Sequence, residues 1–185
     1  MVRPMKWISA TTARSSRDNG VASNCTIGFY KNSCSRVSWS CSSNTINLGS
    51  GGTCQVSVTG CTQIAAIEGN SSATNMMNAL RAQELATKLN VCSSPALGSA
   101  FMVIANGDAT GLAPGATVNQ ILQAADSFIA GLTNCNLSAG NVNRPKAEAF
   151  KNLFDKINNF PNAASSGTGV IINPTPCTTN CLATP

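Results

Sequence analysis

Nine cysteines are the feature of this sequence that most constrains its fold. Five lie within residues 25–61, two are isolated, and two lie near the end: Cys25, Cys34, Cys41, Cys54, Cys61, Cys92, Cys135, Cys177 and Cys181. Zinc ligands usually come in pairs that are about two to four residues apart. Only Cys177 and Cys181 have that spacing, and no second pair lies near them. We therefore expect disulfide bonds at these positions, and no metal site.

The same cysteines indicate a compartment. Disulfides persist in oxidising environments, and only 10% of the residues are charged. This composition favours an extracellular or cell-surface protein. However, the apolar stretch after Arg3 and Lys6 is only Trp7-Ile8, whereas the apolar core of a secretory signal needs about 7–15 residues. Export would then need another route or an upstream start, and a chain that stays inside the cell is the remaining alternative. Because nine is odd, at least one thiol is free or bonded to another molecule.

The sequence also excludes several classes of protein. With no histidine, the chain has no Ser-His-Asp or Cys-His nucleophile pair and no two-histidine metal site. No apolar run approaches the roughly 20 residues of a membrane-spanning helix. The net charge of +5 comes from residues 1–36, which lack a dense basic cluster. We expect no cofactor, no membrane span and no nucleic-acid partner.

The chain divides into three parts by composition. Residues 1–24 form a basic leader that we expect to be extended. Residues 25–160 form a cysteine-rich cap and a helical bundle. Residues 161–185 form a tail that is rich in Ser, Thr, Pro and Gly and contains Cys177 and Cys181.

The cap carries the signal of a β-hairpin. Apolar and polar residues alternate over 37–41 and again over 54–58, which is the pattern of half-buried strands. A glycine-rich stretch at 49–52 provides the loop between them. Cys41 and Cys54 fall on the apolar sides of these strands, so the pattern allows a disulfide between them.

The rest of the chain has helical periodicity. Apolar residues at three- and four-residue steps predict helices over 62–68, 72–90, 95–104, 118–132 and 145–160, with Thr117 as the cap of the fourth. The helix over 72–90 has apolar residues on most sides, which indicates a central position. We predict a mainly α fold, a small four- to five-helix bundle with a disulfide-stapled, β-hairpin-containing N-terminal segment.

Charged residues of two helices invite a chemical interpretation. Arg81, Glu84 and Lys88 define one charged face, on which Glu84 and Lys88 form a favourable i,i+4 pair. Glu148 and Asp155 also share a face and could be a glycosidase pair. Lys151 lies between those two, so a solvated ladder of ion pairs is the simpler interpretation. Asp108 is a single acid and falls short of a calcium loop. We assign no catalytic residue.

One short segment of the sequence matches a known motif more specifically than the patterns above match any function. Residues 25–32 (CTIGFYKN) resemble the Cys-Thr-x-Gly-Tyr-Trp-Lys-Asn opening of a family of bacterial extracellular modules. Four later stretches follow in the order of that family: residues 80–90 resemble its Leu-Ala-x-Gln-Leu-x-x-Ala-Lys-Leu-Asn helix, 105–108 its Ala-Asn-Gly turn, 124–132 its Ala-Ala-Asp helix and 155–159 its closing Asp-Asp-Tyr-Asn-Asn.

The chain also departs from this family pattern. Ile27 replaces its usual Gln, Tyr30 its Trp and Ser33 its His, and an apparent insertion spans 92–103. The family consists of secreted or surface-attached modules of uncharacterised role. The resemblance therefore implies a location more than an activity.

The leading functional hypothesis is a non-enzymatic extracellular structural or assembly module, such as a component of a surface layer, sheath or filament. Its partners would be copies of itself or other surface proteins. The unpaired cysteine adds a reason to expect a covalent or oligomeric partner.

One alternative is a carbohydrate- or cell-wall-binding module with a glycan partner. Its candidate ligand contacts are Phe29, Tyr30, Lys31, Asn32 and Trp39. The strand pattern points Trp39 inward, which argues against this alternative. Phe29 and Tyr30 would instead pack the cap onto the bundle, with Lys31 extending outward.

A second alternative is an enzyme that uses a thiol or a pair of carboxylates. Cys34 and Cys41 lie near Lys31 and Arg36, which would lower the pKa of a thiol. Structural bridging by these cysteines is the favoured interpretation, because other cysteines lie close in sequence.

Overall fold

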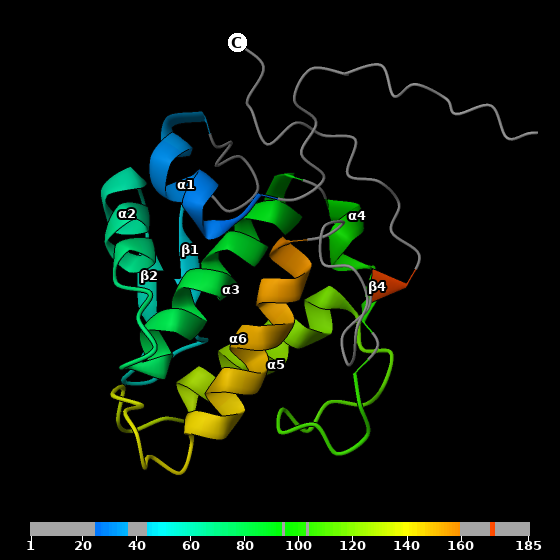
Figure 1. Ribbon diagram of the computed structural model, residues 1–185. Coiled ribbons are helices and arrows are strands. Elements are labelled where there is room, and N and C mark those ends of the chain that lie inside the picture. Colours follow the sequence, from blue (N-terminus) through cyan, green and yellow to red (C-terminus); the bar gives the residue numbers. More distant parts are fainter. Residues whose placement is uncertain (1–24, 37–43, 94, 103, 160–170, 173–185) are drawn as a thin grey trace, which may run out of the picture.

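The structure is a computed structural model that describes residues 25–36, 44–93, 95–102, 104–159 and 171–172. Within these residues the chain is mainly helical, as predicted from the sequence. Its helices are α1 (Ile27–Ser33), the 3-10 helix η1 (Cys34–Arg36), α2 (Cys61–Gly69), α3 (Met76–Ser93), α4 (Pro95–Gly98), α5 (Val118–Ala130) and α6 (Arg144–Asn158) (Figure 1). Two antiparallel strand pairs accompany them: β1 (Ile46–Leu48) with β2 (Val56–Val58), and β3 (Phe101–Met102) with β4 (Ile171–Ile172). The predicted leader lies outside the described residues.

Helix α3 is the centre of the bundle, as its wide apolar coverage predicted. Most of its side chains are buried, because α6, α2, α1, α4 and the β1–β2 hairpin all pack against it. The helix begins at Met76, later than the predicted start at residue 72. Asn75 sets this start, since its Oδ1 accepts hydrogen bonds from the N–H groups of Met77 (3.1 Å) and Leu137 (3.0 Å). The side chain of Asn75 thereby caps the first turn.

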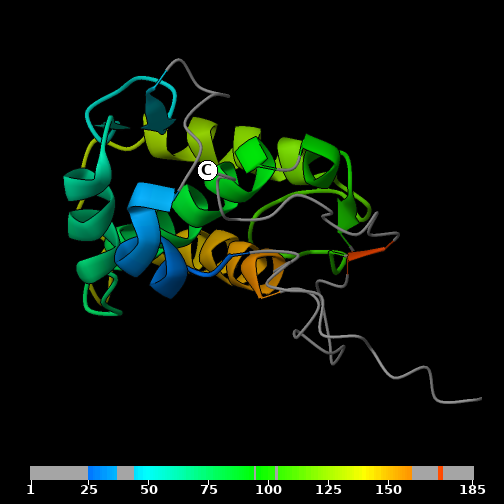
Figure 2. The ribbon, with the colours of Figure 1, turned by 90° about the horizontal axis from the view of Figure 1, so that it is seen from above.

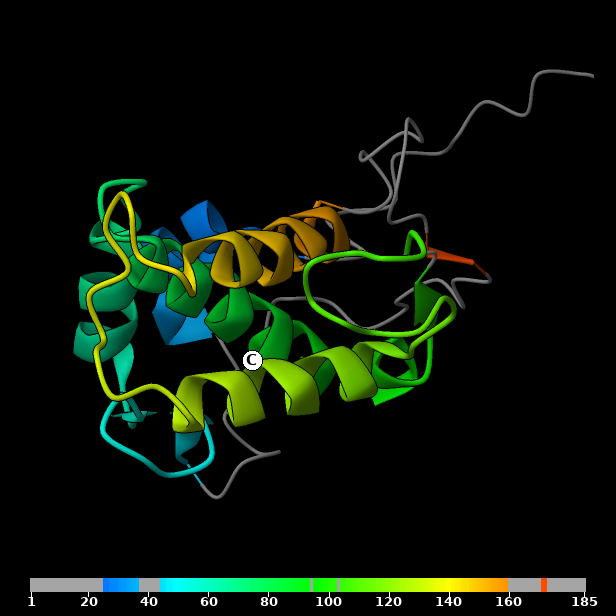
Figure 3. The same cartoon turned by 90° about the horizontal axis from the view of Figure 1, so that it is seen from below.

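Helices α5 and α6 run in opposite directions (Figure 3). They meet through Phe128 and Phe150, whose ring centroids are 5.7 Å apart. The predicted cap of α5 is confirmed: Thr117 Oγ1 accepts from the Gln120 N–H, and Gln120 Oε1 accepts from the Thr117 N–H. Helix α6 buries five residues that the periodicity assigned to the core: Ala147, Phe150, Leu153, Phe154 and Ile157. Phe160 lies outside the described residues.

The predicted helix over 95–104 is wrong beyond its first turn. Helix α4 ends at Gly98, where a Cβ atom would come within 2.5 Å of the Asn119 side chain. The chain then becomes extended, and Met102 exchanges backbone hydrogen bonds with Ala116 and Gly115. Phe101 is 51% exposed while Met102 is buried. This alternation is that of a strand. Residues 100–104 form a continuous apolar run in the sequence, and periodicity cannot distinguish a strand from a helix in such a run.

The predicted β-hairpin exists, but with a different first strand. Strand β2 falls within the predicted 54–58, whereas its partner is β1 and not 37–41, which lies outside the described residues. The disulfide between Cys41 and Cys54 that the pattern allowed does not form, because Cys54 is bonded to Cys135. The three residues of β1 follow a buried-exposed-buried pattern, which is a weak signal in a sequence.

Disulfides staple the N-terminal segment to the bundle, as predicted. Cys34 at the end of α1 is bonded to Cys61 at the start of α2. The Cys54–Cys135 bond joins the hairpin to the connection between α5 and α6. Cys25 and Cys92 are disulfide-bonded as well. Every cysteine in the described part of the chain is therefore oxidised, whereas Cys41, Cys177 and Cys181 lie outside it.

Two hydrophobic cores share α3. The larger one lies among α3, α5 and α6, and the smaller one joins α3 to α1, α2 and the hairpin. Among the described residues, no helix is both long and apolar enough to cross a bilayer.

Candidate functional site

The charged face of α3 lies under the β1–β2 hairpin and does not face open solvent. Arg81 Nη2 donates a hydrogen bond to the carbonyl of Cys54, just before β2. Lys88 Nζ donates to the carbonyl of Asn47 in β1. The two ends of this face thus hold the two strands of the hairpin, and Glu84 lies between them with 0% of its surface exposed.

Glu84, Lys88 and Asp126 form a charge cluster that connects α3 with α5. Lys88 Nζ lies 3.0 Å from Glu84 Oε1 and 2.6 and 2.8 Å from the two oxygens of Asp126. Burial raises the pKa of Glu84 to about 8; Lys88 opposes this rise and Asp126 adds to it. At neutral pH, Glu84 is therefore mostly a neutral acid beside an ammonium–carboxylate pair.

The loop of the hairpin lies beside α5 (Figure 2), and Asp126 of the charge cluster holds it there. Asp126 Oδ1 accepts a hydrogen bond of 2.7 Å from the N–H of Gly49. Gly49 has φ +85°, and a Cβ atom there would lie 2.6 Å from Ile129 Cγ2. Only glycine combines this backbone conformation with so close an approach. The cluster therefore acts as a docking point for the loop.

A second polar network links the cap to α3 and α6. Asn90 Oδ1 accepts from the Cys25 N–H and the Tyr30 hydroxyl, each at 2.8 Å. Asn90 Nδ2 donates to the Cys25 carbonyl at 2.9 Å and to Asn158 Oδ1 at 3.0 Å. Thr87 also donates to Asn158 Oδ1, at 3.0 Å. The amide of Asn90 thus has all its hydrogen-bonding atoms occupied, which a buried amide requires.

The candidate ligand contacts of the cap differ in how far they are exposed to solvent. Tyr30 is 1% exposed and donates its hydroxyl to Asn90, so its ring is an interior group. Phe29 is half-buried and packs edge-on against Tyr30, with ring centroids 5.4 Å apart. Lys31 and Asn32 are exposed, and Asn32 donates to the Gly28 carbonyl. The packing interpretation of Tyr30 is confirmed, and Trp39 lies outside the described residues.

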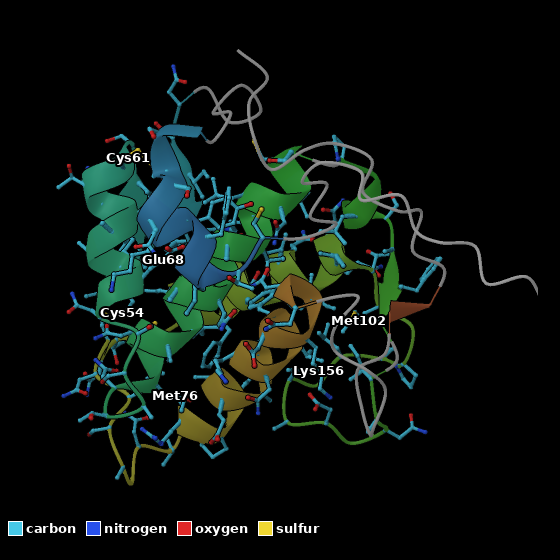
Figure 4. All side chains as sticks on the ribbon, turned by 45° about the horizontal axis from the view of Figure 1, so that its top comes forward. Cys54, Cys61, Glu68, Met76, Met102 and Lys156 are labelled. Atoms are coloured by element: carbon cyan, nitrogen blue, oxygen red, sulfur yellow. A yellow bond between two sulfur atoms is a disulfide. The ribbon has the colours of Figure 1, made fainter. Side chains whose placement is uncertain are left out.

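Glu68 is a buried acid between α2 and α1 (Figure 4). Burial raises its pKa to about 8, although Lys31 favours the ionised form. Neither carboxyl oxygen has a hydrogen-bond partner among the described residues. The burial of this acid could not be predicted from the sequence, because Glu68 is followed by Gly69-Asn70 and has the pattern of a helix end.

Of the two acids proposed on α6, Glu148 is exposed and Asp155 contacts neighbouring side chains. Lys151 lies 3.8 Å from Asp155, which supports the predicted ladder at that step. Asp155 Oδ1 also accepts from Gln83 Nε2 of α3 at 2.9 Å. Asp108 accepts from the N–H and hydroxyl of Thr110 and so closes a turn. Among the described residues, no group of three or more acids or cysteines is arranged to hold a metal ion.

The residues that carried the family resemblance are the ones that build these two networks. Residues 25–32 supply Cys25 and Tyr30, and 80–90 supply Glu84, Lys88 and Asn90. Asp126 lies within 124–132, and Asn158 within 155–159. The motifs therefore contained the signal for these contacts, although residue patterns alone did not show that they converge.

Comparison with known proteins found no similar protein. No protein-family model, curated protein or solved structure matches this chain. The function must therefore be argued from the geometry above.

Proposed function

We propose that this protein is a non-enzymatic extracellular structural or assembly module, a component of a surface layer, sheath or filament. The observation that carries the proposal is that every cysteine in the described part of the chain is disulfide-bonded. Such crosslinking is maintained outside the reducing cytosol. We also propose membership of the bacterial extracellular module family that its motifs resemble.

The polar networks support the proposal. Lys88 and Asp126 are bonded to the hairpin backbone and to each other. Asn90 is fully occupied by structural partners. These groups hold elements together, a task suited to a module that must persist outside the cell.

The carbohydrate-binding alternative loses one of its contacts. Aromatic rings that bind sugars stack on them with an open face, whereas Tyr30 is enclosed. The thiol-enzyme alternative loses Cys34, which is bonded to Cys61. We therefore favour the structural proposal over both alternatives.

Cell fractionation tests the location. Protein from its native host is separated into medium, surface extract and cytosol, and each fraction is run on reducing and non-reducing gels. We expect the chain in the medium or surface extract, with faster migration of the unreduced monomer because intact disulfides keep it compact. Its recovery only from cytosol, in a reduced form, would overturn the proposal.

Sedimentation and electron microscopy test the assembly. The purified oxidised protein should form larger species as its concentration rises, or disulfide-linked oligomers that disappear on reduction. A monomer at every concentration, together with binding on a glycan array, would favour the carbohydrate-binding alternative. A monomer without glycan binding would contradict the assembly role. The extracellular location would still be tested separately by the fractionation experiment.

A further inference from the structure

A cavity of about 180 Å³ lies between β2, α2 and α3, at the other end of the charged face from Lys88. Half of its lining residues are aliphatic and the other half carry hydrogen-bond donors: Val56, Ala66, Ile67, Asn70, Asn78 and Arg81. Small-molecule sites typically combine an apolar wall with a few polar groups in this way.

Arg81 is the charged residue of this cavity, and its charge is not neutralised. It forms no salt bridge with any described residue. Its carboxyl neighbour, Glu84, is mostly neutral at pH 7, because its pKa is about 8. Burial lowers the pKa of Arg81, and Glu84 opposes this shift.

Arg81 also has hydrogen-bonding capacity to spare. One terminal nitrogen donates to the Cys54 carbonyl, whereas Nε is buried and has no acceptor among the described residues. Asn70 and Asn78 use their backbone N–H groups in local turns. Their side-chain amides form no hydrogen bond within the described part of the chain.

We propose that this cavity binds a small monocarboxylate with a short aliphatic tail. Its carboxylate oxygens accept hydrogen bonds from Arg81 and from the amides of Asn70 and Asn78, and its tail lies against Val56, Ala66 and Ile67. A guanidinium matches the planar carboxylate in shape and charge. One cation neutralises one negative charge, which favours a monoanion over a phosphate dianion. The inference does not depend on the proposed structural role.

The volume sets the size of the ligand. At about 30 Å³ per water molecule, the cavity holds roughly six water-sized groups, enough for a carboxylate with a three-carbon tail. Two sources supply this chemistry: a free short-chain acid, or the C-terminal carboxylate of a peptide that ends in a small aliphatic residue. For so small a ligand, we expect an affinity on the order of millimolar.

The test is an NMR titration of the oxidised full chain, labelled with ¹⁵N. The probes are butyrate, its neutral analogue butyramide, inorganic phosphate, and a short peptide ending in valine with a free or an amidated C-terminus. Butyrate should cause saturable shifts at the Arg81 Nε–H and at the backbone of Ala66, Asn70 and Asn78. Butyramide should bind about tenfold more weakly, because it loses the charge-assisted hydrogen bonds.

The free-acid and amidated forms of the peptide distinguish the two sources of the ligand. Tighter binding of the free-acid peptide than of butyrate or of the amidated peptide assigns the site to a peptide terminus. Equal or tighter binding of butyrate assigns it to a free acid. Either result supports the proposal.

Two neighbouring alanines of α2 provide a matched pair of variants. Ala66 lines the cavity and Ala65 does not, while both are exposed on the same helix. Ala66→Leu should fill the cavity and abolish saturable binding, with the fold retained, whereas Ala65→Leu should bind butyrate as the wild type does. Arg81→Lys should weaken binding about tenfold, since lysine keeps the charge and loses the planar donor pair.

Several results would overturn the inference. These are the absence of saturable shifts up to tens of millimolar butyrate, equal binding of butyramide or phosphate, and binding that survives Ala66→Leu. None of these outcomes bears on the extracellular location or on the assembly of the protein.

Discussion

The substitution Glu84→Gln tests the charge cluster under the hairpin. Glu84 is completely buried, and burial raises its pKa to about 8, from an ordinary value of 4.5. Between these two pH values the folded chain binds a proton at Glu84 that the unfolded chain has released. Glutamine has the shape of the protonated acid and keeps donors to offer Asp126, but it cannot ionise. The variant therefore preserves the contacts and removes the titration.

The sign and size of the effect follow from proton linkage. Because the folded pKa is raised, Glu84 makes the protein less stable as pH rises from about 4.5 to about 8. One bound proton corresponds to about 1.4 kcal/mol per pH unit. From about pH 6 to about pH 7.5, the wild type should lose roughly 2 kcal/mol through this group, and the variant should not. Glu68 adds a loss of the same sign in both proteins.

Urea unfolding with the disulfides intact, followed by circular dichroism across this pH range, measures the effect. Glu84→Gln should already be more stable than the wild type by roughly 2 kcal/mol near pH 6, and this difference should grow by roughly another 2 kcal/mol by about pH 7.5. Glu148→Gln, which removes an exposed carboxylate from α6, is the control for the change in net charge. Parallel stability curves for the wild type and Glu84→Gln would refute the reasoning.

Three further predictions concern the packing of the hairpin and cap. Asn90→Ala leaves several buried groups without a hydrogen-bond partner. It should lower the free energy of unfolding by about 3 kcal/mol or more in urea melts. Gly49→Ala should cost about 2 kcal/mol or more, against about 1 kcal/mol for Gly107→Ala, which has the same φ sign but open space around it; equal costs would contradict the close approach of the loop. Removing the Cys54–Cys135 bond by a double alanine substitution should destabilise the chain by about 4 kcal/mol, measured by thermal melts, since it spans a sequence separation of 81.

The sequence predicted those parts of the fold that depend on long periodic patterns. Helices α3, α5 and α6 repeat their apolar residues over several turns, and Thr117 caps α5 as expected. Short elements were predicted less well. Residues 100–104 are all apolar, so their pattern has no period that separates a strand from a helix, and β1 has only three residues. In such short segments, pairing with a partner strand determines whether a strand forms. The local sequence pattern carries no information about that partner.

The polar interior was predicted least well, for a physical reason. Glu84 and Lys88 match the spacing of an exposed ion pair, and only the hairpin that covers them makes them buried. Asn90 finds its partners about 60 residues away in Tyr30 and 68 away in Asn158. Contacts of this range depend on the tertiary arrangement. Only the family resemblance, which singled out the segments that contain them, gave any sign of these residues.

The central claim is that the cysteines form structural crosslinks in the protein as it exists in its native setting. Peptide mapping by mass spectrometry, after alkylation of the unreduced native protein, tests it most directly. We predict linked peptides that contain Cys34–Cys61 and Cys54–Cys135, with no alkylated thiol at Cys25 or Cys92. Alkylation of these six cysteines in a protein that is still folded would contradict the account.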